Sequence, residues 1–450
     1  MTTFLSPAEA GRFYWLAAIL AVAVSPIASA VGNHYFRNLL SWEESGEAWY
    51  RLRQFLVGLT IAAVTVGTVV AYVAKWHYGV EMGPLVFALV PFVFATEASN
   101  VAFAPLNILS KRSVYVALST LAAFLKPGLA VLAVILLGPS ARNWMLGLAV
   151  GAMLPAAAAV LYLRRCFRSR TGQSVVIAPL DLAEFLRFTW PMATGSLLYW
   201  GQTQANRLVV ENVLSPETLG SFAANYSAGV GILVAFEALF QQYYQPIFYR
   251  GVTSSEEDQK RETVQSLADV LLPILVLIGL LVICGARPLS WILLGRDFQS
   301  DYRLIAWAAA AESVRIASGC YHLAAVGRKR TDLLLPAGVS GAVTSVVGVF
   351  VLGRLWGIDG LGPALLLASL SMFFTLGICM RRHFVLNLPL RRMGLVMVAS
   401  SPACVALLLL RSRDLSILHW AMHLVVVLAS GAGGLFFSVR GVIHLRGGNQ

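Results

Sequence analysis

The chain carries its apolar residues in long blocks, and these blocks limit what it can fold into. They suit the roughly 20 residues that an α-helix needs to cross a hydrocarbon core of about 30 Å. With 58% hydrophobic and only 12% charged residues, the chain also has too little charge to cover the surface of a soluble domain. Short alternating strands, the pattern of a membrane β-barrel, do not occur. The sequence therefore predicts an all-α integral membrane protein.

Hydropathy assigns thirteen spans to the chain. The spans 83–104 and 186–210 are the least apolar, and residues 287–303 are a candidate for a short interfacial helix. In chain order the spans are 12–32, 55–74, 83–104, 114–137, 144–163, 186–210, 219–240, 267–285, 303–325, 333–353, 360–380, 393–410 and 418–438.

The net charge of +12 comes from Lys and Arg in short loops, which favours topology signals and anionic lipid over nucleic acid as the explanation. Alternate loops hold 22 and 8 of these basic residues. The positive-inside rule then places the loops with 22, and the C-terminus, in the cytoplasm, with Met1 on the opposite side. The five cysteines lack the spacing of a metal site or disulfide framework, and we predict no metal and no cofactor. No cleavable signal peptide is expected, because residues 1–10 contain no Lys or Arg.

The chain also repeats itself. Residues 5–13 recur as 214–222, with Leu-Ser-Pro, Gly and Phe in the same places. Lys111-Arg112 matches Lys329-Arg330, and Arg-Arg-x-Phe at 164–167 matches the same pattern at 381–384. Six spans separate equivalent points, so the copies are a parallel repeat, which predicts two helical lobes around a central cavity. We expect an N-terminal lobe at 1–170 with five spans, a C-terminal lobe at 171–390 with six, and two extra spans at 391–450.

The span 186–210 precedes the second copy, and its counterpart in the first copy would lie before Met1. We therefore expect the first helix of the first lobe to be missing from this chain.

Several short motifs have the order and spacing of a known family. They include Trp190-Pro191, Asn206-Arg207-Leu208, Leu214-Ser215-Pro216-Glu217-Thr218-Leu219-Gly220, Phe222-Ala223-Ala224-Asn225-Tyr226, Pro246, Leu293-Leu294-Gly295-Arg296-Asp297-Phe298, Gly327-Arg328-Lys329-Arg330 and Gly357-Ile358-Asp359-Gly360-Leu361-Gly362.

With these motifs, essentially the whole chain resembles the polysaccharide or O-antigen flippases of the multidrug, oligosaccharidyl-lipid and polysaccharide exporter superfamily. The resemblance implies an inner-membrane protein that is not an enzyme and that moves a lipid-linked oligosaccharide from the cytoplasmic to the periplasmic leaflet. The carrier is expected to be undecaprenyl diphosphate, and the expected partners are membrane lipid and polysaccharide polymerase machinery, without nucleic acid. Asn206 departs from the family, which usually has Asp there.

Charged and polar residues inside spans are the candidates for transport, because charge in a membrane helix is costly and tends to be functional. Arg207 shares a helical face with Ser196, Trp200 and Thr203 if the span is one continuous helix. The predicted substrate-binding residues are Arg207, Lys126, Arg315, Gln204 and Trp200. The predicted coupling-ion residues are Glu97, Glu237 and Glu312. Arg315 and Glu312 are three residues apart and could also simply pair.

Three other functions stay open. A drug/cation antiporter of the same superfamily would have a cavity dominated by carboxylates. A membrane polysaccharide polymerase or ligase would need a sizeable external loop, whereas the longest here, 286–302, has 17 residues. A structural scaffold is the third, although the internal repeat favours transport.

Overall fold

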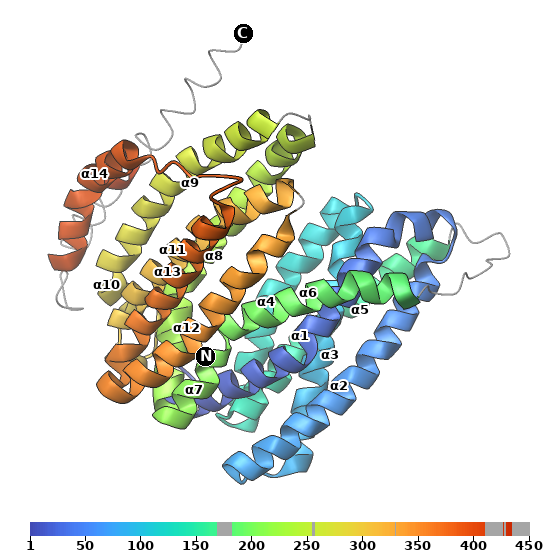
Figure 1. Ribbon diagram of the computed structural model, residues 1–450. Coiled ribbons are helices and arrows are strands. Elements are labelled where there is room, and N and C mark those ends of the chain that lie inside the picture. Colours follow the sequence, from blue (N-terminus) through green and yellow to red (C-terminus); the bar gives the residue numbers. More distant parts are fainter. Residues whose placement is uncertain (169–181, 254–256, 329, 410–425, 427–428, 434–450) are drawn as a thin grey trace. The chain divides into compact units, whose positions relative to one another are not determined.

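The computed structural model describes all residues except 169–181, 254–256, 329, 410–425, 427–428 and 434–450. Within the described residues every regular element is a helix, which confirms the all-helical prediction (Figure 1). Nine helical segments in that part of the chain are long and apolar enough to cross a membrane. This is the construction of a multi-pass membrane protein, because a helix satisfies all of its own backbone hydrogen bonds in lipid.

The helices form two compact units, which divide between Trp200 and Gly201. The first unit contains most of α6 and five preceding helices. Within it α5 packs against α3 and α4, and one part of its core buries Leu39, Leu52, Leu106 and Leu163. The helices are α1 (Pro7–Glu44), α2 (Ala48–Tyr78), α3 (Met82–Ile108), α4 (Arg112–Leu137), α5 (Ala141–Arg168) and α6 (Leu182–Thr203).

The second unit contains the end of α6 and the helices that follow. Its central helix is α11, which packs against α8, α9 and α13 and contributes Ile305 and Ile316 to the core. The helices are α7 (Ala205–Val213), α8 (Pro216–Thr253), α9 (Glu257–Cys284), α10 (Ala286–Leu293), α11 (Arg303–Gly327), α12 (Leu335–Trp356), α13 (Leu361–Met380) and α14 (Leu390–Leu409). Three 3₁₀ turns join them: η1 (Arg296–Phe298), η2 (Thr331–Leu334) and η3 (Gly357–Gly360).

Helix packing within the two units follows the sequence repeat. The pairs α1–α2, α2–α3, α3–α5 and α4–α5 of the first unit correspond to α8–α9, α9–α11, α11–α13 and α12–α13 of the second. Both copies of Ser-Pro begin a helix, and the Ser6 and Ser215 hydroxyls accept hydrogen bonds from the backbone N–H three residues later. Both copies of Arg-Arg-x-Phe end in a buried ring, at Phe167 and Phe384.

The predicted spans up to residue 410 overlap the observed helices, with two differences. The span 186–210 is not one helix, because α6 ends at Thr203 and α7 begins at Ala205. The helices α6 and α11 are not among the nine segments that qualify by apolarity. The possible interfacial helix within 287–303 corresponds to α10. The last predicted span, 418–438, lies largely outside the described residues.

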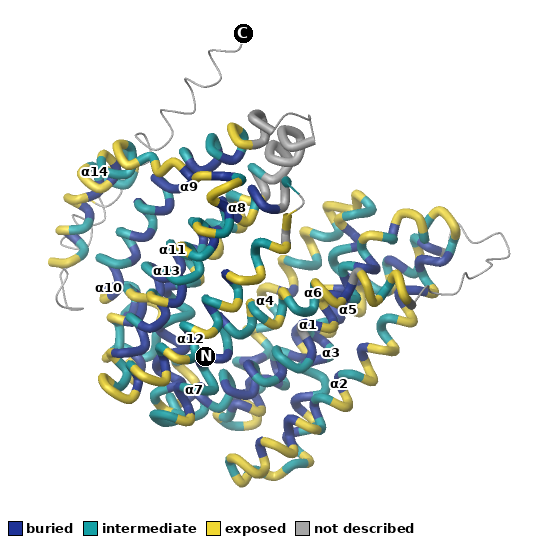
Figure 2. The backbone as a smooth tube through the Cα atoms, in the orientation of Figure 1, coloured by how far each residue is buried: buried dark blue, intermediate teal, exposed yellow. Residues whose placement is uncertain are grey.

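Burial varies along the helices, as Figure 2 shows. In the most hydrophobic part of α4 only 17% of residues are buried inside the protein, and in that of α14 only 22%. A helix that is apolar all round and yet so little buried is suited to a lipid environment. The corresponding part of α9 is 56% buried, which makes it a core helix of the second unit.

Candidate functional site

An ion triad joins α8 to α11 inside the second unit. Arg315 on α11 forms ion pairs with Glu237 on α8 and with Glu312 one helical turn before it, at 2.8 Å for the second pair. The side chains of Arg315 and Glu237 are each 18% exposed and that of Glu312 is 7% exposed. The helices approach closely two to three turns away, where a Cβ on Gly229 would lie 2.6 Å from the carbonyl oxygen of Ile305.

The triad changes how its members can act. The guanidinium of Arg315 donates hydrogen bonds to two carboxylates, those of Glu237 and Glu312. Glu237 also accepts a hydrogen bond of 3.1 Å from Gln241. Two carboxylates and one guanidinium sum to a single negative charge when all are ionised. A site of this charge can take up one proton or one monovalent cation, whereas Arg315 within it is poorly placed to bind an anion.

Lys126 lies in a different setting, in the first unit. It is half-buried on the same face of α4 as the buried residues Ala122 and Ala130, which lie one turn on either side. No hydrogen bond or ion pair joins its ammonium to any residue that the structure describes. Lys126 is therefore an uncompensated positive charge in one of the most apolar helices of the protein.

The backbone around Lys126 is held by glycines of α5. A Cβ on Gly151 would lie 2.6 Å from the Cα of Lys126, and one on Gly147 would lie 2.4 Å from the Cα of Ala130. The two glycines are four residues apart, so they share a face and let the backbones of two membrane helices meet. Pro127 lies in this segment and cannot donate a backbone hydrogen bond, and α5 supports the helix there.

Glu97 lies on α3 and is also half-buried. Asn100 is the neighbouring side chain that interacts with it. The structure does not bring Glu97 into an ion pair with Lys126 or with any other described cation. In the first unit the candidate carboxylate, Glu97, and the candidate cation, Lys126, form no ion pair. In the second unit the candidate carboxylates and the candidate cation Arg315 form ion pairs with one another.

The interruption between α6 and α7 is built by polar groups. Gln204 adopts φ −125° and ψ −31°, and its carbonyl accepts a hydrogen bond of 3.0 Å from the N–H of Arg207. The carbonyl of Gln202 accepts a hydrogen bond of 3.0 Å from the Ser345 hydroxyl of α12, and the buried Asn206 amide contacts both groups at 3.4 Å. Asn206 is thus part of the helix break, which gives its side-chain amide a structural role.

The break also affects two other predicted site residues. Arg207 lies half-buried on α7, beyond the interruption, so the spacing argument that placed it on one face with Trp200 does not hold. Trp200 donates an indole hydrogen bond of 2.8 Å to the carbonyl oxygen of Ala18 on α1. This bond fixes the ring against another helix of the first unit.

A hydroxyl cluster between α12 and α13 was missed in the sequence. Ser371 contacts the hydroxyls of Ser340 and Thr344, the latter at 3.2 Å, and Thr375 donates to Ser340 at 3.1 Å. On each helix the two residues are four apart, so each pair shares a face. This spacing of hydroxyls in two strongly apolar segments is the signal that could have identified the cluster.

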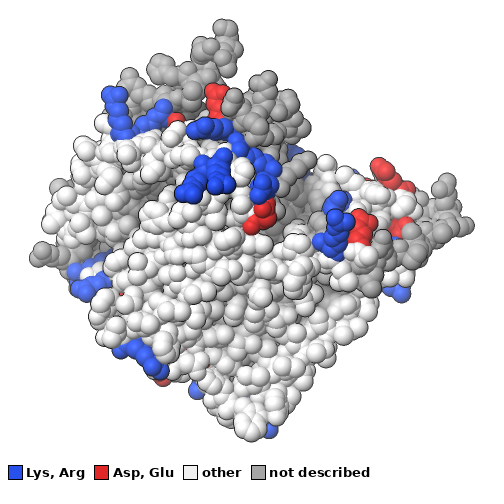
Figure 3. All heavy atoms as spheres, in the orientation of Figure 1, with Lys and Arg blue, Asp and Glu red and all other residues white. Residues whose placement is uncertain are grey.

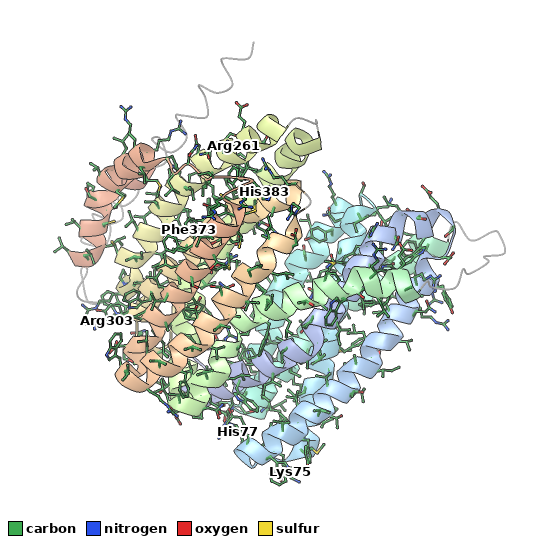
Figure 4. All side chains as sticks on the ribbon, in the orientation of Figure 1. Lys75, His77, Arg261, Arg303, Phe373 and His383 are labelled. Carbon is green, nitrogen blue, oxygen red and sulfur yellow. The ribbon has the colours of Figure 1, made fainter. Side chains whose placement is uncertain are left out.

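On the face that Figure 3 shows, the charged side chains leave a broad area without Lys, Arg, Asp or Glu. Figure 4 labels one charged side chain of the first unit, Lys75, in the last turn of α2, where His77 also lies. A buried ion pair in the same unit, between Arg51 and Glu47 at 2.8 Å, was also missed; their spacing of four residues suits an ion pair within one helix.

Comparison with solved structures identifies proteins that have a similar fold. No protein-family model and no curated protein matches the chain. Its structure is similar to that of the lipid II flippase MurJ in an inward closed conformation, with a TM-score of 0.63 at 13% identity over 96% of this chain and 93% of that one. It is also similar to an inward-facing multidrug resistance MATE family transporter of the MOP superfamily, with a TM-score of 0.63 at 12% identity over 85% and 92%. The chain therefore has the same fold as these two proteins.

Proposed function

We propose that the protein is a flippase that moves a lipid-linked oligosaccharide with a diphosphate headgroup, of the undecaprenyl type, from the cytoplasmic to the periplasmic leaflet. The uncompensated charge of Lys126 is the observation that supports this most strongly. A transporter of an anionic headgroup needs a cation that its own carboxylates leave available, and Lys126 meets that need. MurJ, which has the same fold, is a flippase of lipid II.

Lys126 acts in this proposal as an anchor for a phosphate oxygen. The contacts with Gly147 and Gly151 hold the α4 backbone in place at Lys126. The Cα of Lys126 therefore stays in place while its four-carbon side chain can move the ammonium. A Lys ammonium is a compact point charge that can follow a phosphate through several positions. Arg207 and Gln204 at the break after α6, and the ring of Trp200, are proposed as further headgroup contacts.

The triad of Glu237, Glu312 and Arg315 is the proposed coupling site of the second unit. Its single net negative charge can be cancelled by a proton or a monovalent cation, which would loosen the link between α8 and α11. Glu97 is proposed as a second site of uptake in the first unit. Polysaccharide polymerase machinery is the proposed partner on the periplasmic side, and the inner membrane is the proposed location, with the C-terminus in the cytoplasm.

The second candidate function is a drug/cation antiporter of the same superfamily. The ion triad favours it, because an acidic site that takes up a proton can drive export of a cation. The solved MATE transporters with this fold are described as multidrug resistance proteins. The two functions differ in the charge of the transported molecule, which is an anion for the flippase and a cation for the antiporter. A transport assay with each kind of substrate can therefore distinguish them.

The test uses the full chain in proteoliposomes. A fluorescent undecaprenyl diphosphate-linked disaccharide is placed in both leaflets, and bleaching by external dithionite measures the fraction that exchanges. We expect exchange with the wild type, strong loss with Lys126→Met and partial recovery with Lys126→Arg. Lys75→Met is the matched control, because Lys75 is an exposed lysine at the end of a helix in the same unit.

Two outcomes would contradict the proposal, the first by rejecting the flippase and the second by rejecting the role of Lys126 in it. One is absence of exchange by a correctly inserted wild type that instead transports ethidium against a proton gradient, which would establish the antiporter. The other is equal exchange by the Lys126→Met and Lys75→Met variants, which would remove Lys126 from the pathway.

A further inference from the structure

The link between α13 and α14 lies where two membrane-length helices end and begin. The first helix ends at Met380 and the second begins at Leu390, and both belong to segments apolar enough to span a membrane. Residues 381–389 must therefore lie at a membrane surface, beside the lipid headgroups. His383, in this link, is labelled in Figure 4 near the same end of the second unit as Arg261, and Arg303 is labelled toward the other end.

The link is packed on the second unit and hydrogen-bonded to it. Phe384 and Leu386 alternate with outward residues and are buried in the core of the second unit. The Gln265 side chain of α9 forms two hydrogen bonds with the backbone of Asn387, of 2.7 and 3.0 Å. Arg392 pairs with Asp269 at 3.8 Å and donates to its carbonyl at 3.3 Å. The outward side chains of the link are thus presented by an anchored backbone.

Those outward side chains are of two kinds. Val385, Leu388 and Leu390 are large apolar residues that are 50%, 46% and 68% exposed. Arg381, Arg382 and Arg391 are exposed as well, and none of them pairs with a carboxylate among the described residues. Arg330, by contrast, is occupied by Asp332, with two contacts of 3.0 Å. Figure 3 shows basic side chains gathered at this end of the second unit.

We propose that residues 381–391 form a binding site for anionic phospholipid. The three arginines bind headgroup phosphates, and the exposed leucines and valine enter the boundary between headgroups and acyl chains. Arg suits this role because its planar fork can donate two hydrogen bonds to phosphate oxygens at once. A soluble anion would leave the apolar residues in water, whereas a phospholipid satisfies both kinds of side chain. The proposal does not depend on what the protein transports.

The experiment measures thermal unfolding of the full chain in a neutral detergent, with added lipid. Dioleoylphosphatidylglycerol is the anionic probe, dioleoylphosphatidylcholine is the zwitterionic one, and inorganic diphosphate represents a free anion. Native mass spectrometry counts the phosphatidylglycerol molecules that remain bound. The test variant is Arg381→Gln/Arg382→Gln/Arg391→Gln, and the control is Arg296→Gln/Arg303→Gln, which removes exposed arginines elsewhere in the same unit.

We expect phosphatidylglycerol to raise the unfolding midpoint of the wild type and of the control variant more than phosphatidylcholine does. The triple variant should lose at least half of this difference and retain fewer phosphatidylglycerol molecules. Equal stabilisation of the triple variant and the control would overturn the site. Equal stabilisation by inorganic diphosphate would show an anion site that does not need a lipid. A variant with apolar residues replaced, Leu388→Ser/Leu390→Ser, should lose the preference for lipid over diphosphate.

Discussion

Arg315 on α11 and Glu237 on α8 form an ion pair although 78 residues separate them in the chain. The pair is largely buried, and Glu312 shares the same guanidinium. Removing the guanidinium from such a group leaves two carboxylates together in a poorly solvated place. The three residues therefore form one electrostatic unit, and substitutions in it should not be additive.

Arg315→Gln should be the most destabilising single substitution in the triad, at about 3 to 5 kcal/mol, because it leaves Glu237 and Glu312 without a cation. Glu237→Gln should cost less, since Arg315 keeps Glu312. The double variant Arg315→Gln/Glu237→Gln should recover part of the loss. Denaturant unfolding in detergent measures these differences, with the exposed Arg303→Gln as the control. Equal stability of Arg315→Gln and Arg303→Gln would contradict the buried triad.

Ser345→Ala should destabilise the second unit by about 1 kcal/mol or more, because it removes the donor to the carbonyl of Gln202 at the helix break. Ser318→Ala is the matched control: Ser318 is also buried, but its hydroxyl bonds only to its own helix, at the carbonyl of Val314. Thermal unfolding of the two variants should differ. If both behave as the wild type, the Ser345 bond does not stabilise the break.

Gly147→Ala and Gly151→Ala should each destabilise the first unit by about 1 to 3 kcal/mol, because the new methyl group overlaps the α4 backbone. Gly128→Ala is the control, since nothing lies within 4 Å of its added Cβ. It should be neutral or slightly stabilising, given the higher helix propensity of Ala. A methyl group tolerated equally at all three positions would mean that α4 and α5 are farther apart than the structure shows.

The positions of most helices could be predicted, because a membrane helix needs a long apolar run and the run is visible in the sequence. The caps at Ser6 and Ser215 follow from the Ser-Pro pairs in the same way. The break after α6 could not be predicted, since residues 201–204 include no proline. Its stabilising hydroxyl comes from Ser345, 143 residues away.

The candidate site was predictable only where partners are near in sequence. The contact of Arg315 with Glu312 follows from a spacing of three, but the contact with Glu237 depends on how α8 and α11 pack. The Gly147 and Gly151 spacing indicates a close helix contact without saying which helix is the partner. That α4 is the partner, and that Lys126 lies at the contact, required the structure.

Membrane topology gives a further prediction. A reporter fused after Gln450 should be cytoplasmic, and reporters fused near Arg142 or Leu214 should be periplasmic, because 22 against 8 basic residues set the orientation. Paired phosphatase and fluorescent protein fusions measure this, each active on one side only. A periplasmic reporter after Gln450 would require a different number of spans after α14.

Arg207 lies on α7, just after the helix break, and we expect it to contact the diphosphate of the transported lipid. The alternative role of Arg207 is to anchor its helix at the membrane interface. Arg354 is the comparison residue, because it is an exposed arginine in the last turn of α12. Its guanidinium lies 4.2 Å from the ring centre of Phe350. Arg207→Ala should strongly reduce exchange of the labelled undecaprenyl diphosphate-linked disaccharide in proteoliposomes. Arg207→Lys should reduce it partly, since Lys keeps the charge but loses the two-point fork.

Arg354→Ala should leave exchange unchanged, because an arginine that anchors a helix at the membrane surface positions that helix and does not contact the transported lipid. Protein level and unfolding midpoint, measured for all three variants, separate loss of transport from loss of fold. If Arg207→Ala and Arg354→Ala exchange the passenger equally at equal protein level, Arg207 is an anchor. In that case Lys126 would remain the proposed contact for the headgroup, because its charge lies within a membrane helix and no carboxylate of the described residues compensates it.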